Sequence, residues 1–125
     1  FGDPEKLETL NAIAWRGITH RVRGILEDRR EQGMALAAID AIALLESPLK
    51  ELCQLTVAVL APQEVRVRRI MAREGISEHY AWARVKAQRP DEYFIRNCDY
   101  TLVNDLPAAE EFSQKAREFL KEVLL

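Results

Sequence analysis

The chain has 125 residues, of which 48% are hydrophobic and 30% are charged, and its formal net charge at pH 7 is −2. Because this composition can supply an apolar core, it predicts one globular domain and argues against a disordered chain. Because the net charge is slightly negative, the protein surface as a whole is not expected to bind nucleic acid or an anionic membrane. Any site for anions is therefore expected to be local.

The cysteines and the apolar pattern indicate the cellular compartment. Cys53 and Cys98 lie far apart in the sequence, without a Cys-x-x-Cys motif or a nearby histidine pair, so we expect two buried thiols rather than a zinc site or a disulfide. No apolar stretch approaches the roughly 20 residues of a membrane span, and the start of the chain lacks the features of a signal peptide. These observations predict a cytoplasmic protein. Because the first residue is not Met, we also expect the chain to be part of a longer protein.

The first third of the chain has helical patterning. Asp3-Pro4 is typical of a helix start, since Asp accepts hydrogen bonds from free amides and Pro is tolerated at the first position. Gly33 is expected to end the helical region in a left-handed conformation. Apolar residues recur at three- and four-residue spacing and predict one buried face, followed by a second helical pattern. The first set is Leu7, Leu10, Ile13 and Ala14, and the second is Ile18, Val22, Ile25 and Leu26.

Three short apolar runs are expected to be strands. Residues 34–39 form a run that ends at Asp40, residues 55–60 are β-branched and uninterrupted, and residues 100–103 are the third candidate. The segments between them are helical in pattern. Strands separated by helices indicate parallel pairing, so the sequence predicts an α/β fold.

Two further helices and a final one are predicted from their boundaries. Pro62 opens a helix that Gly75 ends, Ser77 caps the next helix, and Pro90 breaks it. The final helix has an apolar face formed by Phe112, Ala116, Phe119, Leu120, Val123 and Leu124.

The helix after Pro62 is expected to have one packed and one cationic face. At about 100° per residue, Arg66, Arg69 and Arg73 fall within about 60° of each other. The opposite side carries the apolar residues Val67, Ile70 and Met71. Two interpretations remain open: a solvated face neutralised by carboxylates elsewhere, or phosphate recognition, which suits the bidentate guanidinium group.

The following helix places Tyr80, Arg84 and Gln88 on one face at four-residue spacing. Two adjoining helices with cationic or polar groups are typical of a hinged cover over an anionic ligand, whose closure would exclude water. A structural ion pair is the alternative for Arg84.

Other candidate residues have simpler alternatives. Asp40 follows a predicted buried strand, where it would hold Mg²⁺ through water or orient a substrate hydroxyl, or serve only as a helix cap or turn carboxylate. Glu46 is a weaker candidate in the same loop. His20 is interpreted as an ordinary surface histidine unless it binds substrate. Trp15 and Trp82 are expected to be core or interface anchors, and His79 to face solvent.

Several runs together resemble the dephospho-coenzyme A kinase family, and their order and spacing fit it over nearly the whole chain. The matching pieces are Leu10-Asn11-Ala12-Ile13, Asp40 with Leu44, Leu45, Glu46 and Ser47, the arginine helix, Arg84 with Gln88, Asp99-Tyr100, and Asn104-Asp105. The resemblance implies a partial P-loop kinase fold, in which parallel sheet strands are flanked by helices and joined to a helical substrate region and a helical lid.

The resemblance divides the single incomplete domain into three regions. Residues 1–33 would form the helical coenzyme A-binding region, residues 34–74 and 97–125 the core, and residues 75–96 the lid. The implied ligands are ATP, Mg²⁺ and dephospho-coenzyme A, with neither nucleic acid nor membrane as a partner. The implied activity is phosphorylation of the ribose 3′-hydroxyl of dephospho-coenzyme A.

The same resemblance implies roles for individual residues, transferred position by position. Arg73 and Arg84 are expected to be catalytic. The residues expected to bind ATP are Arg69, Gln88 and Arg96. The residues expected to bind dephospho-coenzyme A are Asn11, His20, Asp40 and Glu46. No residue is assigned to a metal.

The chain departs from the family at several places, and the basic residues that the family has before its last strand are only partly present, as Arg96. Trp15-Arg16 stand where the family has His-Pro, although Ile18-Thr19-His20 resembles that signature five residues later. Ile42 and Leu45 replace the family's Pro and Phe. No Gly-rich loop ending in Gly-Lys-Ser or Gly-Lys-Thr is present, so we expect the 125 residues alone to have little or no activity. The remaining alternatives are another P-loop kinase for a nucleoside or small alcohol, and a non-catalytic helical interaction module.

Overall fold

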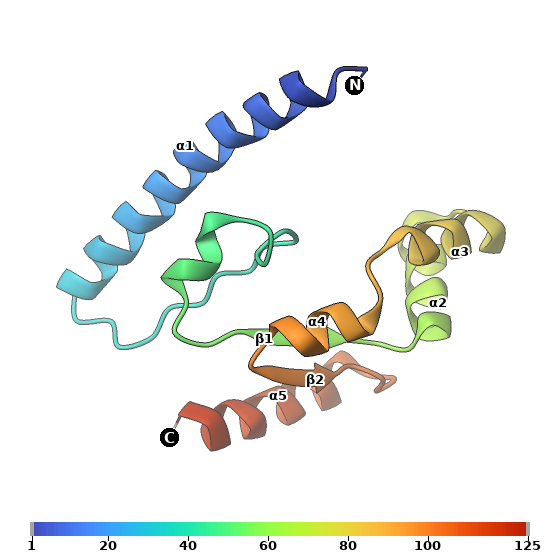
Figure 1. Cartoon of the computed structure of the whole chain (residues 1–125). Helices are drawn as coiled ribbons and strands as arrows, with labels where there is room; N and C mark the ends of the chain where they lie inside the picture. Colours follow the sequence, from blue (N-terminus) through green and yellow to red (C-terminus); the bar gives the residue numbers. More distant parts are fainter. Residues whose placement is uncertain (1, 125) are drawn as a thin grey trace. The chain divides into compact units, whose positions relative to one another are not determined.

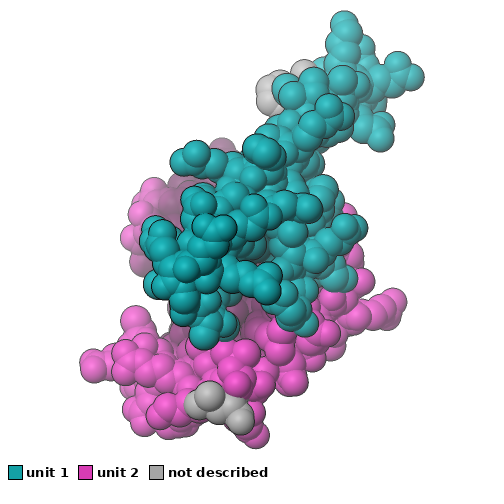
Figure 2. Space-filling model, turned by 90° about the vertical axis from the view of Figure 1, so that its left-hand side faces the viewer, with its two compact units in different colours: residues 1–54 teal, residues 55–125 magenta. Residues whose placement is uncertain are grey.

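The computed structural model describes residues 2–124 and forms two compact units, residues 1–54 and 55–125, coloured separately in Figure 2. The sequence predicted one incomplete domain with three regions, and that finer division stays a prediction. Among the described residues, no helix combines the length and the hydropathy that crossing a membrane requires.

The first unit is built on one long helix, α1, Pro4–Glu31 (Figure 1). As expected, Asp3 caps its start, because the Asp3 carboxylate accepts hydrogen bonds from the amides of Glu5 and Lys6 at 3.1 and 3.3 Å. Beyond its end, Gly33 has a φ of +80°, the left-handed conformation predicted for it. The two helical patterns of the sequence are therefore one continuous helix of 28 residues.

Two expectations for this unit are wrong. The apolar face of α1 is not buried, since Leu10 and Ile13 are each 62% exposed and α1 contains no buried residue. Within its unit α1 packs against the short helix η1, Pro48–Leu52, which is too small to cover the face. The predicted strand 34–39 is an exposed loop, and Leu36 is 65% exposed. A strand requires a neighbouring backbone to pair with, and no described strand lies in this unit.

The second unit contains the sheet. Strands β1, Val57–Leu60, and β2, Tyr100–Val103, pair in parallel with Val57 opposite Tyr100. This confirms the predicted α/β class and parallel pairing, with two strands among the described residues instead of three. The crossover between them carries three helices.

The first two crossover helices form a hairpin (Figure 1). Helix α2, Gln63–Glu74, ends at Gly75, whose φ is +66°, and helix α3, Glu78–Ala87, begins after the Ser77 cap. Both boundaries were predicted. The hairpin encloses a small core of Val67, Ala81 and Val85, with Ile70, Met71, Ile76 and Trp82 packed around it. The apolar face of α2 therefore packs as expected, and Trp82 is a core anchor.

The remaining helices flank the strands. Helix α4, Asp91–Asn97, follows Pro90 and contacts β1, and the sequence did not indicate it as a separate element. Helix α5, Ala109–Leu124, runs beside β2, where the rings of Tyr100 and Phe119 are 5.7 Å apart. The predicted apolar face of α5 is half-buried at most positions, whereas Leu120 and Leu124 are 42% and 40% exposed.

Both cysteines are free thiols, as expected, but they are half-buried and not buried. The Cys53 thiol donates a weak hydrogen bond to the Leu49 carbonyl at 3.6 Å. Partial burial raises the pKa of the Cys53 thiol, because a thiolate is poorly solvated there.

Candidate functional site

Two arginines of the helical hairpin converge on one carboxylate. Glu74, the last residue of α2, accepts a hydrogen bond through Oε1 from Arg73 Nη2 at 2.9 Å. Its Oε2 accepts from Nη1 of Arg84, which reaches across from α3. The side chains of Arg73, Arg84 and Glu74 are 74%, 54% and 31% exposed. The structure thus brings together the two residues expected to be catalytic, and the hydrogen bonds from Arg73 and Arg84 lower the pKa of Glu74.

Arg66 joins α2 to the start of α4. Its Nη1 donates to Gln88 Oε1 at 2.6 Å and its Nη2 donates to Asp91 Oδ1 at 3.3 Å. Gln88, expected to bind ATP, is therefore engaged with α2 in this conformation. The carboxylates that neutralise the arginine face lie outside the run between Arg66 and Arg73. This arrangement agrees with the interpretation of a solvated face neutralised by carboxylates elsewhere in the sequence.

Arg69 holds the loop after β2. Its guanidinium donates to the carbonyl oxygens of Asn104 and Leu106 at 3.0 and 3.1 Å, and to Asn104 Oδ1 at 3.2 Å. Arg69 was expected to contact ATP, and in this structure its side chain instead holds a loop. Arg96 is exposed on α4, and its side chain forms no hydrogen bond or ion pair with any residue that the structure describes.

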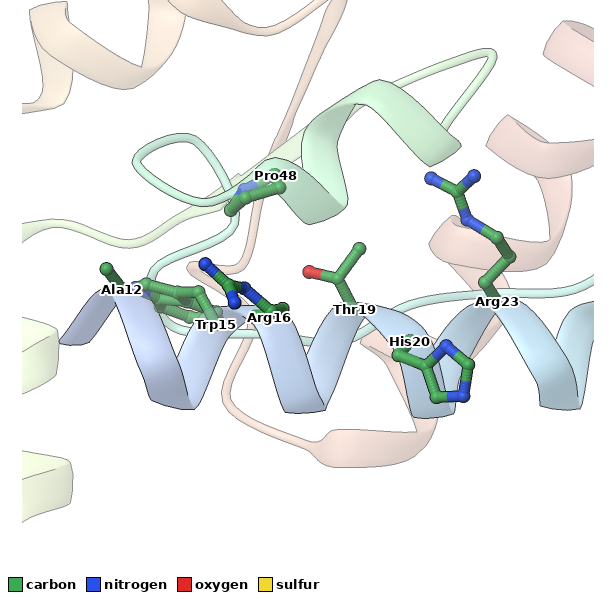
Figure 3. A pocket seen from close by; sticks show the side chains of 7 residues that line it. All are labelled: Ala12, Trp15, Arg16, Thr19, His20, Arg23 and Pro48. Carbon is green, nitrogen blue, oxygen red and sulfur yellow. The ribbon is translucent and has the colours of Figure 1, made fainter. Parts of the chain in front are cut away.

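A groove of about 560 Å³ lies within the first unit, between α1 and η1 (Figure 3). Figure 3 shows Arg16, Thr19 and Arg23 on the side of α1 that faces Pro48. The Thr19 hydroxyl oxygen is shielded from solvent and has no hydrogen-bond partner among residues 2–124. The full lining is Ala12, Trp15, Arg16, Thr19, His20, Arg23 and Pro48.

Some of the residues expected to bind the substrate line the groove, and others do not. His20 and Trp15, the two candidates for the family's histidine position, both line it. Asn11, Asp40 and Glu46 are exposed and are not part of its lining. The sequence interpretation missed the guanidinium groups of Arg16 and Arg23. Their helical spacing with Thr19 and His20 was the signal that could have found them.

The acidic residues that the structure describes do not gather into a cluster of metal ligands. Among residues 2–124, no three His, Cys, Asp or Glu side chains gather closely enough to hold a metal ion. A Mg²⁺ ion that binds through water and phosphate oxygens needs fewer carboxylates than such a cluster, so the expected use of Mg²⁺ stays a prediction.

Parallel strands joined by helices define an α/β protein, and its crossover helices carry a group of guanidinium side chains. The sequence profile of the family described as dephospho-CoA kinase matches residues 1–110. The chain therefore belongs to the dephospho-CoA kinase family. This result confirms the resemblance inferred from the sequence.

Individual relatives agree with this assignment. The dephospho-CoA kinase of Carboxydothermus hydrogenoformans is 31% identical over 104 residues, which are 83% of this chain and 50% of that protein. The dephospho-CoA kinase of Moorella thermoacetica is 38% identical over 97 residues, 77% of this chain and 46% of that protein. The chain thus spans about half the length of these curated relatives.

Solved structures share the fold. The crystal structure of TT1252 from Thermus thermophilus has a TM-score of 0.64 and 31% identity, covering 98% of this chain and 62% of that one. The dephospho-CoA kinase from Campylobacter jejuni has the same TM-score at 19% identity, covering 98% and 60%, so that likeness supports the fold alone.

Proposed function

We propose that the protein to which this chain belongs transfers the γ-phosphoryl group of ATP to the ribose 3′-hydroxyl of dephospho-coenzyme A, the last step of coenzyme A biosynthesis. The observation that carries this proposal is the family match over residues 1–110. The named relatives support it, because several dephospho-CoA kinases are about 30% identical to the chain over most of its length.

The arginines of the helical hairpin suit the nucleotide side of this reaction. Phosphoryl transfer depends on positioning and on stabilising negative charge, and guanidinium groups donate two parallel hydrogen bonds to phosphate oxygens. Arg73 and Arg84 come from different helices and already converge on one anionic group. We assign them to the transferred phosphoryl group.

Three other residues are proposed to contact ATP less directly. Arg69 and Gln88 bind other parts of the chain in this structure, so their proposed role includes holding the loop after β2 and the end of α3 in place. Arg96 is exposed on α4 and available to a phosphate.

The groove of the first unit suits dephospho-coenzyme A. Arg16 and Arg23 offer cations for its pyrophosphate, and Trp15 offers a flat ring on which its adenine can stack. His20 supplies an imidazole at the same groove. Asn11, Asp40 and Glu46 remain proposed contacts for parts of the substrate that extend beyond the groove.

The phosphate cradle of a P-loop kinase is not within these 125 residues, since they contain no Gly-x-x-x-x-Gly-Lys-Ser or -Thr motif. In such enzymes the loop amides and Lys hold the phosphates, and Mg²⁺ neutralises their charge. Arginines alone do not replace that cradle. We therefore predict that the 125-residue chain by itself has little or no turnover.

A coupled assay of ADP release tests the proposal. The intact protein should turn over ATP with dephospho-coenzyme A and not with nucleoside monophosphates, and the product should carry its new phosphate on the 3′-oxygen. Preference for a nucleoside monophosphate would instead assign it to another kinase class. Turnover by the 125-residue chain close to that of the intact protein would contradict the prediction about the cradle.

A further inference from the structure

The Glu74 carboxylate occupies the position between two guanidinium groups that a phosphate would be expected to take. Oε1 accepts from Arg73 and Oε2 accepts from Arg84, so each oxygen has its own arginine. A phosphoryl group also presents separate oxygens to separate donors. The internal carboxylate and an incoming phosphate therefore require the same two partners.

We propose that Glu74 is a positioning residue that holds Arg73 and Arg84 together before a ligand binds and then competes with the ligand's phosphate for them. This inference rests on the proposed function, in which the two arginines bind phosphate. Glu74 does not touch the reacting atoms and acts only through the arginines.

The contacts explain why such a residue is needed at this place. Arg73 lies at the end of α2 and Arg84 lies on α3, and the turn Gly75–Ser77 brings the two helices together. Two guanidinium groups at one point repel each other unless an anion lies between them. Glu74 provides that anion from the helix end itself, so the cationic pair is already formed when no ligand is present.

The exposure of the cluster explains how a phosphate can take the place of the carboxylate. All three side chains are partly exposed, and water weakens ion pairs at exposed positions. A polyphosphate carries more charge than one carboxylate and therefore displaces it. The cost of displacement reduces the apparent affinity for the phosphate ligand.

The test is calorimetric titration of the intact protein with inorganic triphosphate at low salt. Glu74→Gln should bind triphosphate about threefold more tightly than the matched variant Glu64→Gln. Glu64 lies in the first turn of the same helix, so its substitution changes the net charge equally at a distance from the arginines. High salt should remove most of the difference in affinity between the two variants, because it screens interactions between exposed charges.

Each outcome is decisive. Affinity of Glu74→Gln equal to or weaker than that of Glu64→Gln overturns the competition, whatever the melting temperatures. If Glu74→Gln does not fold, Glu74→Asp replaces it, with Glu64→Asp as the control because both substitutions keep the net charge. The shorter carboxylate of Glu74→Asp should compete less well for the arginines, so this variant should also bind triphosphate more tightly than its control. Arg84→Ala distinguishes a failure of the proposed function, in which the arginines bind phosphate, from a failure of the competition by Glu74. If Arg84→Ala leaves the affinity for triphosphate unchanged, the arginines do not bind phosphate and the proposed function loses that assignment. If Arg84→Ala weakens binding but the Glu74 variants have the same affinity as their controls, only the competition by Glu74 is wrong.

Discussion

Asp99 and Thr56 bind each other through reciprocal hydrogen bonds at the point where the two parallel strands begin. Asp99 Oδ2 accepts from the amide and the hydroxyl of Thr56, both at 2.7 Å, and the Asp99 amide donates to Thr56 Oγ1 at 3.1 Å. The amide of Tyr100 also donates to the Thr56 carbonyl at 3.1 Å. Asp99-Tyr100 is one of the runs that resemble the family. In this structure its aspartate sets the register of β1 against β2.

Removal of the Thr56 hydroxyl should destabilise the second unit. Thr56→Val keeps the shape of the side chain but loses a hydrogen bond to a carboxylate, at a cost of about 2 kcal/mol in the free energy of unfolding. Urea denaturation measures this cost. Thr101→Val in β2 is the matched control, because Thr101 is exposed, and its effect should stay within about 0.5 kcal/mol. Equal effects of the two substitutions would contradict the assigned role of Thr56.

Arg69→Lys should loosen the loop after β2. One ammonium group cannot reproduce the three hydrogen bonds that Arg69 donates to Asn104 and Leu106, so we expect a loss of about 1 kcal/mol in stability. Hydrogen exchange in residues 104–108 should become faster. Arg68→Lys, at the neighbouring exposed position, should change neither quantity. Unchanged exchange in Arg69→Lys would show that the loop is held by other contacts.

Two glycine substitutions should have opposite signs although both positions have open space around them. Gly75→Ala places a side chain at a φ of +66° and should cost about 1 kcal/mol. Gly17→Ala, inside α1, should stabilise by about 0.5 to 1 kcal/mol because alanine restricts the unfolded chain and favours helix. Denaturation curves of both variants measure these changes. Stabilisation by Gly75→Ala would mean that the turn between α2 and α3 does not need the left-handed conformation.

The contribution of Glu74 to stability should depend on pH in a defined direction. Its pKa is lowered in the folded state, first by the hydrogen bond from Arg73 and then by that from Arg84. The stabilisation is therefore fully present above the unfolded pKa of about 4.3 and is lost as the pH falls through the lower folded pKa. The melting temperatures of the wild-type protein and Glu74→Gln should differ by a constant amount from about pH 7 to pH 5 and should converge as the pH falls through the lowered pKa of folded Glu74. A difference that persists at the acidic end would exclude ionised Glu74 as its source.

Local chemistry predicted most of the helix boundaries. Asp3, Ser77, Gly33 and Gly75 act through their own backbone and their nearest neighbours, so their positions in the sequence are enough to place helix ends. The parallel pairing of β1 and β2 was also predictable from the alternation of strands and helices. The run of residues 34–39 has the composition of a strand but not the pairing partner that a strand needs, and it is therefore a loop here.

The sequence by itself determined the α/β class, the helix ends and the membership of the family, because these depend on local patterns and ordered motifs. The tertiary structure alone decided what each candidate side chain contacts. Asp99 and Thr56 are 43 residues apart, Arg69 and Asn104 are 35 apart, and Arg66 and Gln88 are 22 apart. Burial and charge pairing are properties of groups that meet only after the chain has folded, and for that reason no spacing rule could show that Glu74 lies between Arg73 and Arg84.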